Sequence, residues 1–123
     1  MDSESLKATE AYSASKATHP RVSLDDMKAK IAGQYFFSAL DGVDGHYRGG
    51  PEAQGCMHAR ELGLLTICIL VMQNGFTVIG KSAPASPENF DAEKGRLFAY
   101  EDAIKQLWPL EGYALRDRLA EAV

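Results

Sequence analysis

The sequence predicts an α+β domain in which a single β-hairpin packs with an N-terminal helix, a long central helix and a short C-terminal helix. Two apolar runs, LLTICILVM and FTVIGKSA, are joined by Asn74-Gly75, and an Asn-Gly pair between such runs is the strongest short-range signal for a hairpin with a type I′ turn. The next segment, SPENFDAEKGRLFAYEDAIKQLW, begins with a helix cap and continues with apolar residues at helical spacing. A chain of 123 residues can bury one modest core. We therefore expect one domain, at residues 21–123.

The N-terminal segment, residues 1–20, is predicted to be a flexible tail or at most a frayed helix. It is rich in Ser, Ala, Thr and Lys and ends in a proline. A helix should begin after Ser23, whose hydroxyl can cap the first turn, with Asp26 placed as in a capping box. Apolar residues at helical spacing predict its buried stripe: Leu24, Met27, Ile31 and Tyr35. The helix is expected to end near Asp41-Gly42.

The segment between this helix and the hairpin, Asp41–Gly55, is predicted to be a long exposed loop. Its sequence, DGVDGHYRGGPEAQG, is too rich in glycine to favour a regular element. Long loops in compact domains are often functional. Residues 56–61 are expected to add a helical turn before the first strand.

The hairpin has one strand that is apolar on both faces. With Asn74 and Gly75 as the two turn residues, Val71 pairs with Val78 and Leu70 pairs with Ile79. One face then carries Ile67, Ile69, Val71, Phe76 and Val78, and the other carries Cys68, Leu70, Met72, Thr77, Ile79 and Lys81. Both faces must be covered, either by helices of the same chain or by a partner subunit. The sequence therefore predicts a homodimer or a larger closed homo-oligomer.

The central helix is predicted to begin with Ser86 at the N-cap and Pro87 at the first helical position. Its core stripe is formed by Phe90, Leu97, Ile104 and Leu107. Gly95 costs roughly 1 kcal/mol against Ala inside a helix, so we expect a neighbouring backbone to approach it closely. Pro109 is expected to end the helix, and residues 110–122 to form the short C-terminal one.

Charge and composition exclude several classes of function. The net charge of −4, with both signs interspersed, argues against duplex nucleic-acid binding through a basic face. The longest uncharged apolar run, Leu62–Met72, is too short to span a bilayer. The N-terminus lacks the apolar segment of a secretory signal, so we expect a cytoplasmic protein. Cys56 and Cys68 are then expected to remain free thiols, with Cys68 buried in its strand.

Four stretches carry a family resemblance: QYFF, LLTICILVMQNGFTVIGKSA, SPENFDAEKG and LWPLEGYALRDRL. They resemble a family of small tailed-phage proteins typified by gene product forty-nine of phage N4 and gene product sixty-six of phage Sf6. Pro84 stands where this family usually has a cysteine, so no role for a thiol at that position carries over. The resemblance implies a phage or prophage origin, and it implies no activity.

Reactive and metal-binding constellations are not evident in the sequence. His46, Cys56 and His58 are the clustered soft ligands, but Cys56-x-His58 is not a usual zinc spacing and a fourth ligand is missing. We interpret them as ordinary loop residues and expect no metal and no cofactor. No serine or cysteine has a convincing base beside it, so we expect a protein that is not an enzyme.

Seven side chains are candidates for binding a ligand or a partner: Tyr47, Arg48, Asn89, Asp91, Trp108, Tyr113 and Arg116. Tyr47 and Arg48 lie in the Gly-rich loop, where an arginine beside an aromatic ring can contact a phosphate or a base. Asn89 and Asp91 lie at the start of the central helix, a position that equally suits structural hydrogen bonds. The other three flank Pro109 and offer a charged stacking platform, although a tryptophan there more often packs in a core or an interface.

The expected function is stoichiometric binding by a small phage accessory protein in the host cytoplasm. The target is either a host antiviral defence factor, which the protein inhibits, or the signalling nucleotide of that factor, which it sequesters. The alternative is a nucleic-acid-associated phage protein without enzymatic activity. A flat apolar patch favours a protein target, whereas a positively charged groove lined by Arg and aromatic residues favours a nucleotide or nucleic acid.

Overall fold

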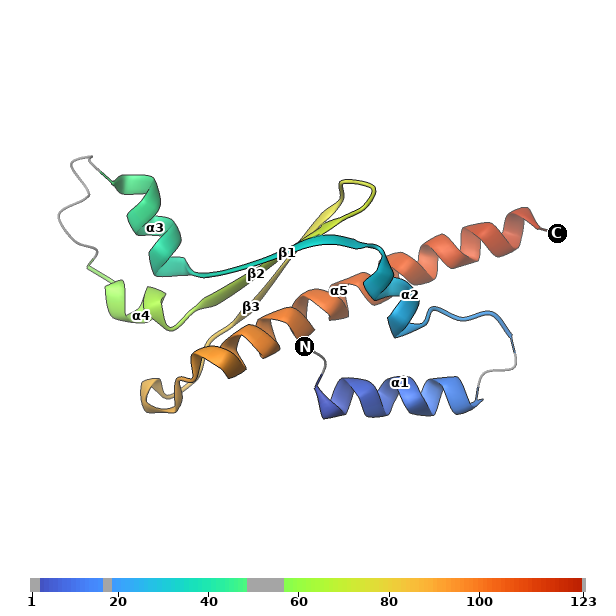
Figure 1. The fold of residues 1–123 in the computed structure, drawn as a ribbon, viewed down its shortest axis with the longest axis horizontal. Coiled ribbons are helices and arrows are strands. Elements are labelled where there is room, and N and C mark those ends of the chain that lie inside the picture. The colour runs from blue at the N-terminus through green and yellow to red at the C-terminus, as the bar shows by residue number, and fades with distance from the viewer. Residues whose placement is uncertain (1–2, 17–18, 49–56, 123) are drawn as a thin grey trace.

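The structure, a computed structural model, describes residues 3–16, 19–48 and 57–122. The α+β class is confirmed: a three-stranded antiparallel sheet in the order β1-β2-β3 lies against the long helix α5 (Figure 1). The strands are β1 (Ile31–Ser38), β2 (Thr66–Met72) and β3 (Thr77–Ser82). The helices are α1 (Glu4–Lys16), α2 (Leu24–Ala29), α3 (Ala39–Tyr47), α4 (Ala59–Gly63) and α5 (Ala92–Glu121), with a 3-10 turn, η2, at Pro87–Asn89.

The first predicted helix is wrong in its second half, which forms strand β1. The sheet therefore has three strands, whereas the sequence predicted a two-stranded hairpin alone. Helix α2 begins as predicted, because the Ser23 hydroxyl accepts the Asp26 N–H at 3.0 Å. It ends at Ala29, and Ile31–Ser38 pairs with β2. The residues Ile31, Tyr35 and Phe37 also fit a period of two, and β-branched and aromatic residues favour strands. Pairing with β2 satisfies backbone groups that β2 would otherwise leave open on that side.

The hairpin is confirmed, but its turn is one residue longer than predicted. Val71 pairs with Thr77, and Leu70 pairs with Val78, so the loop contains Gln73, Asn74 and Gly75. Among the described residues only Gly75 has a positive φ, at 88°, whereas a type I′ turn needs positive φ at both central residues. This shift of one residue moves every side chain of β3 to the opposite face from the one predicted.

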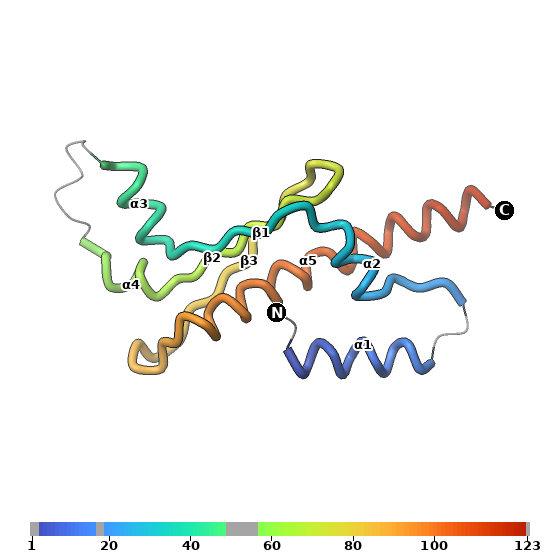
Figure 2. The backbone as a smooth tube through the Cα atoms, in the orientation of Figure 1, coloured from blue at the N-terminus to red at the C-terminus, as the bar shows by residue number. Residues whose placement is uncertain are grey.

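Helix α5 differs from prediction at its start and at Pro109. Asp91 is its N-cap and accepts the N–H groups of Glu93 and Lys94 at 3.0 and 3.2 Å. The Ser86-Pro87 pair begins only the short turn η2. Pro109 lies inside α5, so the expected separate C-terminal helix is the last part of α5, which extends past the sheet in Figure 2. Packing on both sides of the exposed Pro109 holds the helix together, with Leu107 buried before it and Glu111 paired with Lys30 after it.

The predicted loop at Asp41–Gly55 contains a helix. Ser38 caps α3 by accepting the Asp41 N–H at 3.1 Å, and the helix continues to Tyr47 despite two internal glycines. Residues 49–55 of that prediction, together with Cys56, lie outside the described residues. The helical turn expected before the first strand is present as α4.

The core lies between α5 and one face of the sheet. It is formed by Leu24, Met27, Cys68, Leu70, Met72, Val78, Ala99, Tyr100, Ala103, Ile104 and Leu107. Gly80 of β3 makes the closest approach, because a Cβ there would lie 2.0 Å from the Ala99 carbonyl oxygen. Gly95 also lacks room for a Cβ, which would lie 2.7 Å from Thr66 Oγ1. The neighbour of Gly95 is therefore a side chain rather than the backbone that we expected.

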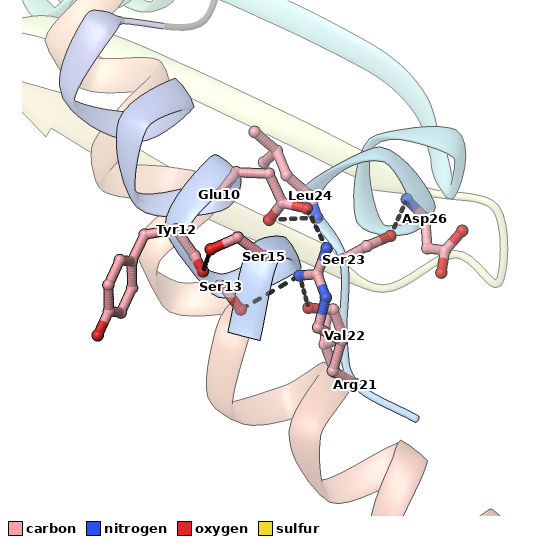
Figure 3. Close-up of polar contacts among 9 residues, drawn as sticks. All are labelled: Glu10, Tyr12, Ser13, Ser15, Arg21, Val22, Ser23, Leu24 and Asp26. Carbon is pink, nitrogen blue, oxygen red and sulfur yellow. Dashed lines mark hydrogen bonds and ion pairs between the residues drawn. The ribbon is translucent and has the colours of Figure 1, made fainter. Parts of the chain in front are cut away.

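Helix α1 occupies most of the segment predicted as a flexible tail or a frayed helix. None of its residues is fully buried, although Leu6 packs against the core. Its main tether is Glu10, whose carboxylate pairs with Arg21 at 2.8 Å and accepts the Leu24 N–H at 3.1 Å (Figure 3). The hydrogen bond from Arg21 lowers the pKa of Glu10 below its usual value.

Candidate interaction surface

The face of the sheet opposite α5 is an apolar surface that no described helix covers. We call it the open face, and three cross-strand rows define it: Gly33–Val71–Thr77, Tyr35–Ile69–Ile79 and Phe37–Ile67–Lys81. Tyr35 is 60% exposed and Ile79 is 57% exposed. Ile67, Ile69 and Val71 in the central strand are half-buried. No described helix packs across this face.

The open face follows from the alternation of side chains along the strands. In β2 the buried residues are Thr66, Cys68, Leu70 and Met72, which face α5, and the intervening isoleucines and valine face outward. At one end, the Phe37 ring borders α3, since a Cβ on Gly42 would lie 3.1 Å from Phe37 Cε2. At the other end, the Tyr35 ring lies beside Gly33. The result is a surface of aromatic and β-branched side chains with Lys81 as its charged residue.

A groove of about 470 Å³ lies on the other side of the sheet, between the hairpin turn and the C-terminal part of α5. Its apolar lining is Met72, Phe76, Leu107, Leu110 and Ala114, and its polar lining is Lys30, Gln73, Asn74, Glu111 and Arg118. The Lys30 ammonium pairs with the Glu111 carboxylate. This pair neutralises one of the two cations of the groove, so Arg118 supplies its net positive charge.

The structure places the seven sequence-predicted binding residues at separate locations. Asn89 and Asp91 line a small pocket of about 180 Å³ beside the end of β3, and Asp91 is engaged as the α5 cap. Tyr113, 73% exposed, and Arg116 lie on the part of α5 that extends past the sheet. Since 25 residues separate Asp91 from Arg116, about 37 Å of helix lies between them.

The remaining predicted residues lie elsewhere. Trp108 packs against the core. Tyr47 and Arg48 are exposed at the end of α3. The rings of Tyr47 and His46 meet edge to face there, with their centroids 4.6 Å apart. Asn89 and Asp91 therefore lie together, and so do Tyr47 and Arg48, but the two pairs lie at different places in the fold.

The part of the chain that the structure describes contains one cysteine thiol, that of Cys68. Cys68 is buried, and burial raises the pKa of its thiol to about 11, which disfavours the reactive thiolate at neutral pH. Within residues 3–16, 19–48 and 57–122, no group of three or more His, Cys, Asp or Glu side chains could hold a metal ion. Neither α5 nor any other described helix has the length and apolar character needed to cross a bilayer.

Sequence reasoning missed the open face for two reasons. Helical spacing predicts a helix for Tyr35 and Phe37, and a two-residue turn places Ile79 on the wrong side of the hairpin. The period-two pattern of Ile31, Gly33, Tyr35 and Phe37 was the available signal. It competed with a helical reading of the same residues.

Comparison with known proteins gives one match. The model of a family described as "Phage protein (N4 Gp49/phage Sf6 gene 66) family" matches residues 22–119. The match begins after α1 and covers the sheet and nearly all of α5. No curated protein and no solved structure matches the chain.

Proposed function

The chain belongs to the N4 Gp49/Sf6 gene 66 family of phage proteins, and we propose that it is an accessory protein that binds a host protein stoichiometrically. The proposed target is a host antiviral defence factor, which the bound phage protein inhibits in the host cytoplasm. In this proposal the protein binds its target, has no catalytic activity and self-associates. The observation that supports it best is the open face.

The composition and shape of the open face suit a protein partner. Aromatic residues are enriched at protein interfaces, while Lys and other charged residues are depleted from interface cores. Tyr35 and Phe37 supply the aromatic rings, and Ile79 extends the apolar surface to β3. Exposed apolar patches of this kind mark interaction sites in soluble proteins.

The nucleotide and nucleic-acid alternatives have weaker support. The groove beside α5 is large enough for a small ligand. However, one of its two cations is paired with Glu111, and its aromatic lining is Phe76 alone among the described residues. The net charge of −4 disfavours a general contact with phosphates. These alternatives are therefore outcomes of the test rather than the proposal.

The test compares three forms of the tagged protein recovered from infected cells. Ile79→Glu places a charge in the middle cross-strand row of the open face, on β3, at a position 57% exposed, so the fold should tolerate it. Tyr113→Glu is the matched control, because Tyr113 is also an exposed apolar residue but lies on α5. The wild type and Tyr113→Glu should recover a host protein at close to one copy per phage chain, and Ile79→Glu should lose it.

Two results would contradict this proposal. Equal recovery of the same protein by all three forms would exclude the open face as the binding site. A nucleotide extracted from the eluate, retained by Ile79→Glu and lost when Arg118 is changed to Ala, would place the function in the groove instead.

A further inference from the structure

The two edges of the sheet are treated differently by the rest of the chain. In β3, the residues with odd numbers direct their backbone groups away from β2. The Lys81 N–H donates to Asp102 Oδ2 at 2.9 Å, and Gln106 Nε2 donates to the Ile79 carbonyl oxygen at 2.6 Å. Both partners are α5 side chains, so α5 caps this edge. A capped edge cannot readily accept another strand.

The other edge, on β1, is not capped. Ala39 N–H donates to the Leu65 carbonyl oxygen at 2.9 Å, which fixes the alternation: odd-numbered residues of β1 face β2, and Gln34 and Phe36 direct their N–H and C=O groups outward. In the described part of the chain, no hydrogen bond reaches these outward groups. The sequence of β1, IAGQYFFS, contains no charged residue and no proline. Charged residues and proline are two of the features that keep an edge strand from pairing, and the irregularity that β1 does have is confined to its start, between Ile31 and Gly33.

We propose that β1 pairs antiparallel with β1 of a second copy of this chain, about a twofold axis at Tyr35, so that the two sheets form one sheet of six strands. This register pairs Gln34 of each copy with Phe36 of the other, and both residues have outward backbone groups. It also overlaps residues 32–38, which is all of β1 except Ile31. On the open face, the two Tyr35 side chains become neighbours, and Gly33, beside the Tyr35 ring of its own chain, lies opposite Phe37 of the second copy.

A second copy fits this edge better than an unrelated extended segment does. A twofold interface uses the same patch on both chains, and β1 supplies both sides without a further sequence.

This inference gives an interface to the self-association proposed above, and it can fail independently of host binding. Pairing occurs at the sheet edge and leaves the open face exposed on both copies. The host partner is assigned to the face. A monomeric protein that still binds its host target would overturn the pairing alone.

The first experiment measures molar mass by light scattering for the wild type, Gln34→Pro and Gln34→Thr. Proline at position 34 removes an outward N–H and leaves the ladder to β2 intact, which edge strands tolerate. The wild type and Gln34→Thr should have twice the 13.4 kDa chain mass, and Gln34→Pro should have the chain mass. A monomeric wild type, or a Gln34→Pro variant that folds and stays dimeric, would overturn the proposal.

A second experiment does not depend on the folding of the proline variant. In a Cys56→Ser background, Tyr35→Cys places two thiols across the twofold axis in a pair whose Cα atoms are about 4.5 Å apart, within the range for a disulfide. Ile79→Cys is the control, because it is equally exposed but lies on β3. Mild oxidation should convert Tyr35→Cys to a covalent dimer and leave Ile79→Cys without a disulfide between chains. Crosslinking of Ile79→Cys in preference to Tyr35→Cys would overturn the pairing.

Discussion

Replacing Gly80 by alanine should separate α5 from the sheet. The added Cβ would lie 2.0 Å from the Ala99 carbonyl oxygen, 2.6 Å from the Ala103 nitrogen and 2.9 Å from the Ala103 Cβ. Two of these atoms belong to the helix backbone, so no side-chain rotation relieves the contact. Since ordinary van der Waals contact begins near 3.4 Å, α5 must withdraw by about 1.4 Å at this point.

The loss in the free energy of unfolding comes from the core contacts that weaken when α5 withdraws. Ile104 and Leu107 of α5 pack against Leu70 and Cys68 of the sheet in the same core. A gap of about 0.5–1 Å already removes a quarter to a half of the dispersion attraction between packed atoms. Overpacking usually costs about 1–3 kcal/mol, and a clash with backbone belongs at or above the upper end. We therefore expect a loss of at least about 3 kcal/mol, from a total on the order of 5–15 kcal/mol.

Urea unfolding monitored by far-UV circular dichroism measures this loss. Gly112→Ala is the matched control: it lies in α5, a Cβ there meets nothing within 4 Å, and it should stabilise the helix by about 0.5–1 kcal/mol. Adding Ala103→Gly to Gly80→Ala should not restore stability, because the two backbone contacts remain. A Gly80→Ala variant with the wild-type urea midpoint would refute the reasoning.

Three further predictions concern the turn, the buried thiol and the N-terminal helix. Gly75→Val should lower stability by more than about 1 kcal/mol, because a β-branched residue resists the φ of +88°; an unchanged urea midpoint would contradict this. In a Cys56→Ser background, Cys68 should react with a thiol reagent at pH 8 only as fast as the chain unfolds, since its pKa is raised to about 11; rapid labelling of the folded protein would show otherwise. Because Arg21 lowers the pKa of Glu10 below its usual 4.5, the pair should stabilise α1 above about pH 4.5 and lose this effect as the pH falls further. Hydrogen exchange of the α1 amides should follow that pH dependence in the wild type and not in Glu10→Gln, and identical profiles would be inconsistent with it.

The sequence predicted those elements whose local signals agree with their tertiary surroundings. Ser23 caps α2, and Asn74-Gly75 lies in the hairpin loop, because these signals depend on nearby backbone groups. The α+β class and the long helix after the hairpin follow from the same kind of information. The family is likewise recognisable from its motifs.

The errors occur where local and tertiary preferences disagree. Tyr35 and Phe37 fit a helix or a strand, and pairing with β2 decides between them. Pro109 predicts a helix end, but Leu107 and the Lys30–Glu111 pair hold α5 continuous across it. The turn is one residue longer than predicted, and this difference in length decides which side of the sheet Ile79 occupies. The open face was therefore not predictable from the sequence with the helix and turn assigned as they were.

The capping of β3 by α5 has a consequence for how far assembly can proceed. A chain with two receptive edges can add neighbours without limit and form fibres, as open-ended association does. Here Asp102 and Gln106 occupy two of the outward backbone groups of β3, so the proposed joining of two copies through β1 would leave an α5-capped edge at each end of the six-stranded sheet. Removing both side chains, by Asp102→Ala together with Gln106→Ala, should leave the β3 edge open and allow the protein to polymerise. In the proposed dimer, two polar side chains on α5 would therefore limit the assembly to two copies.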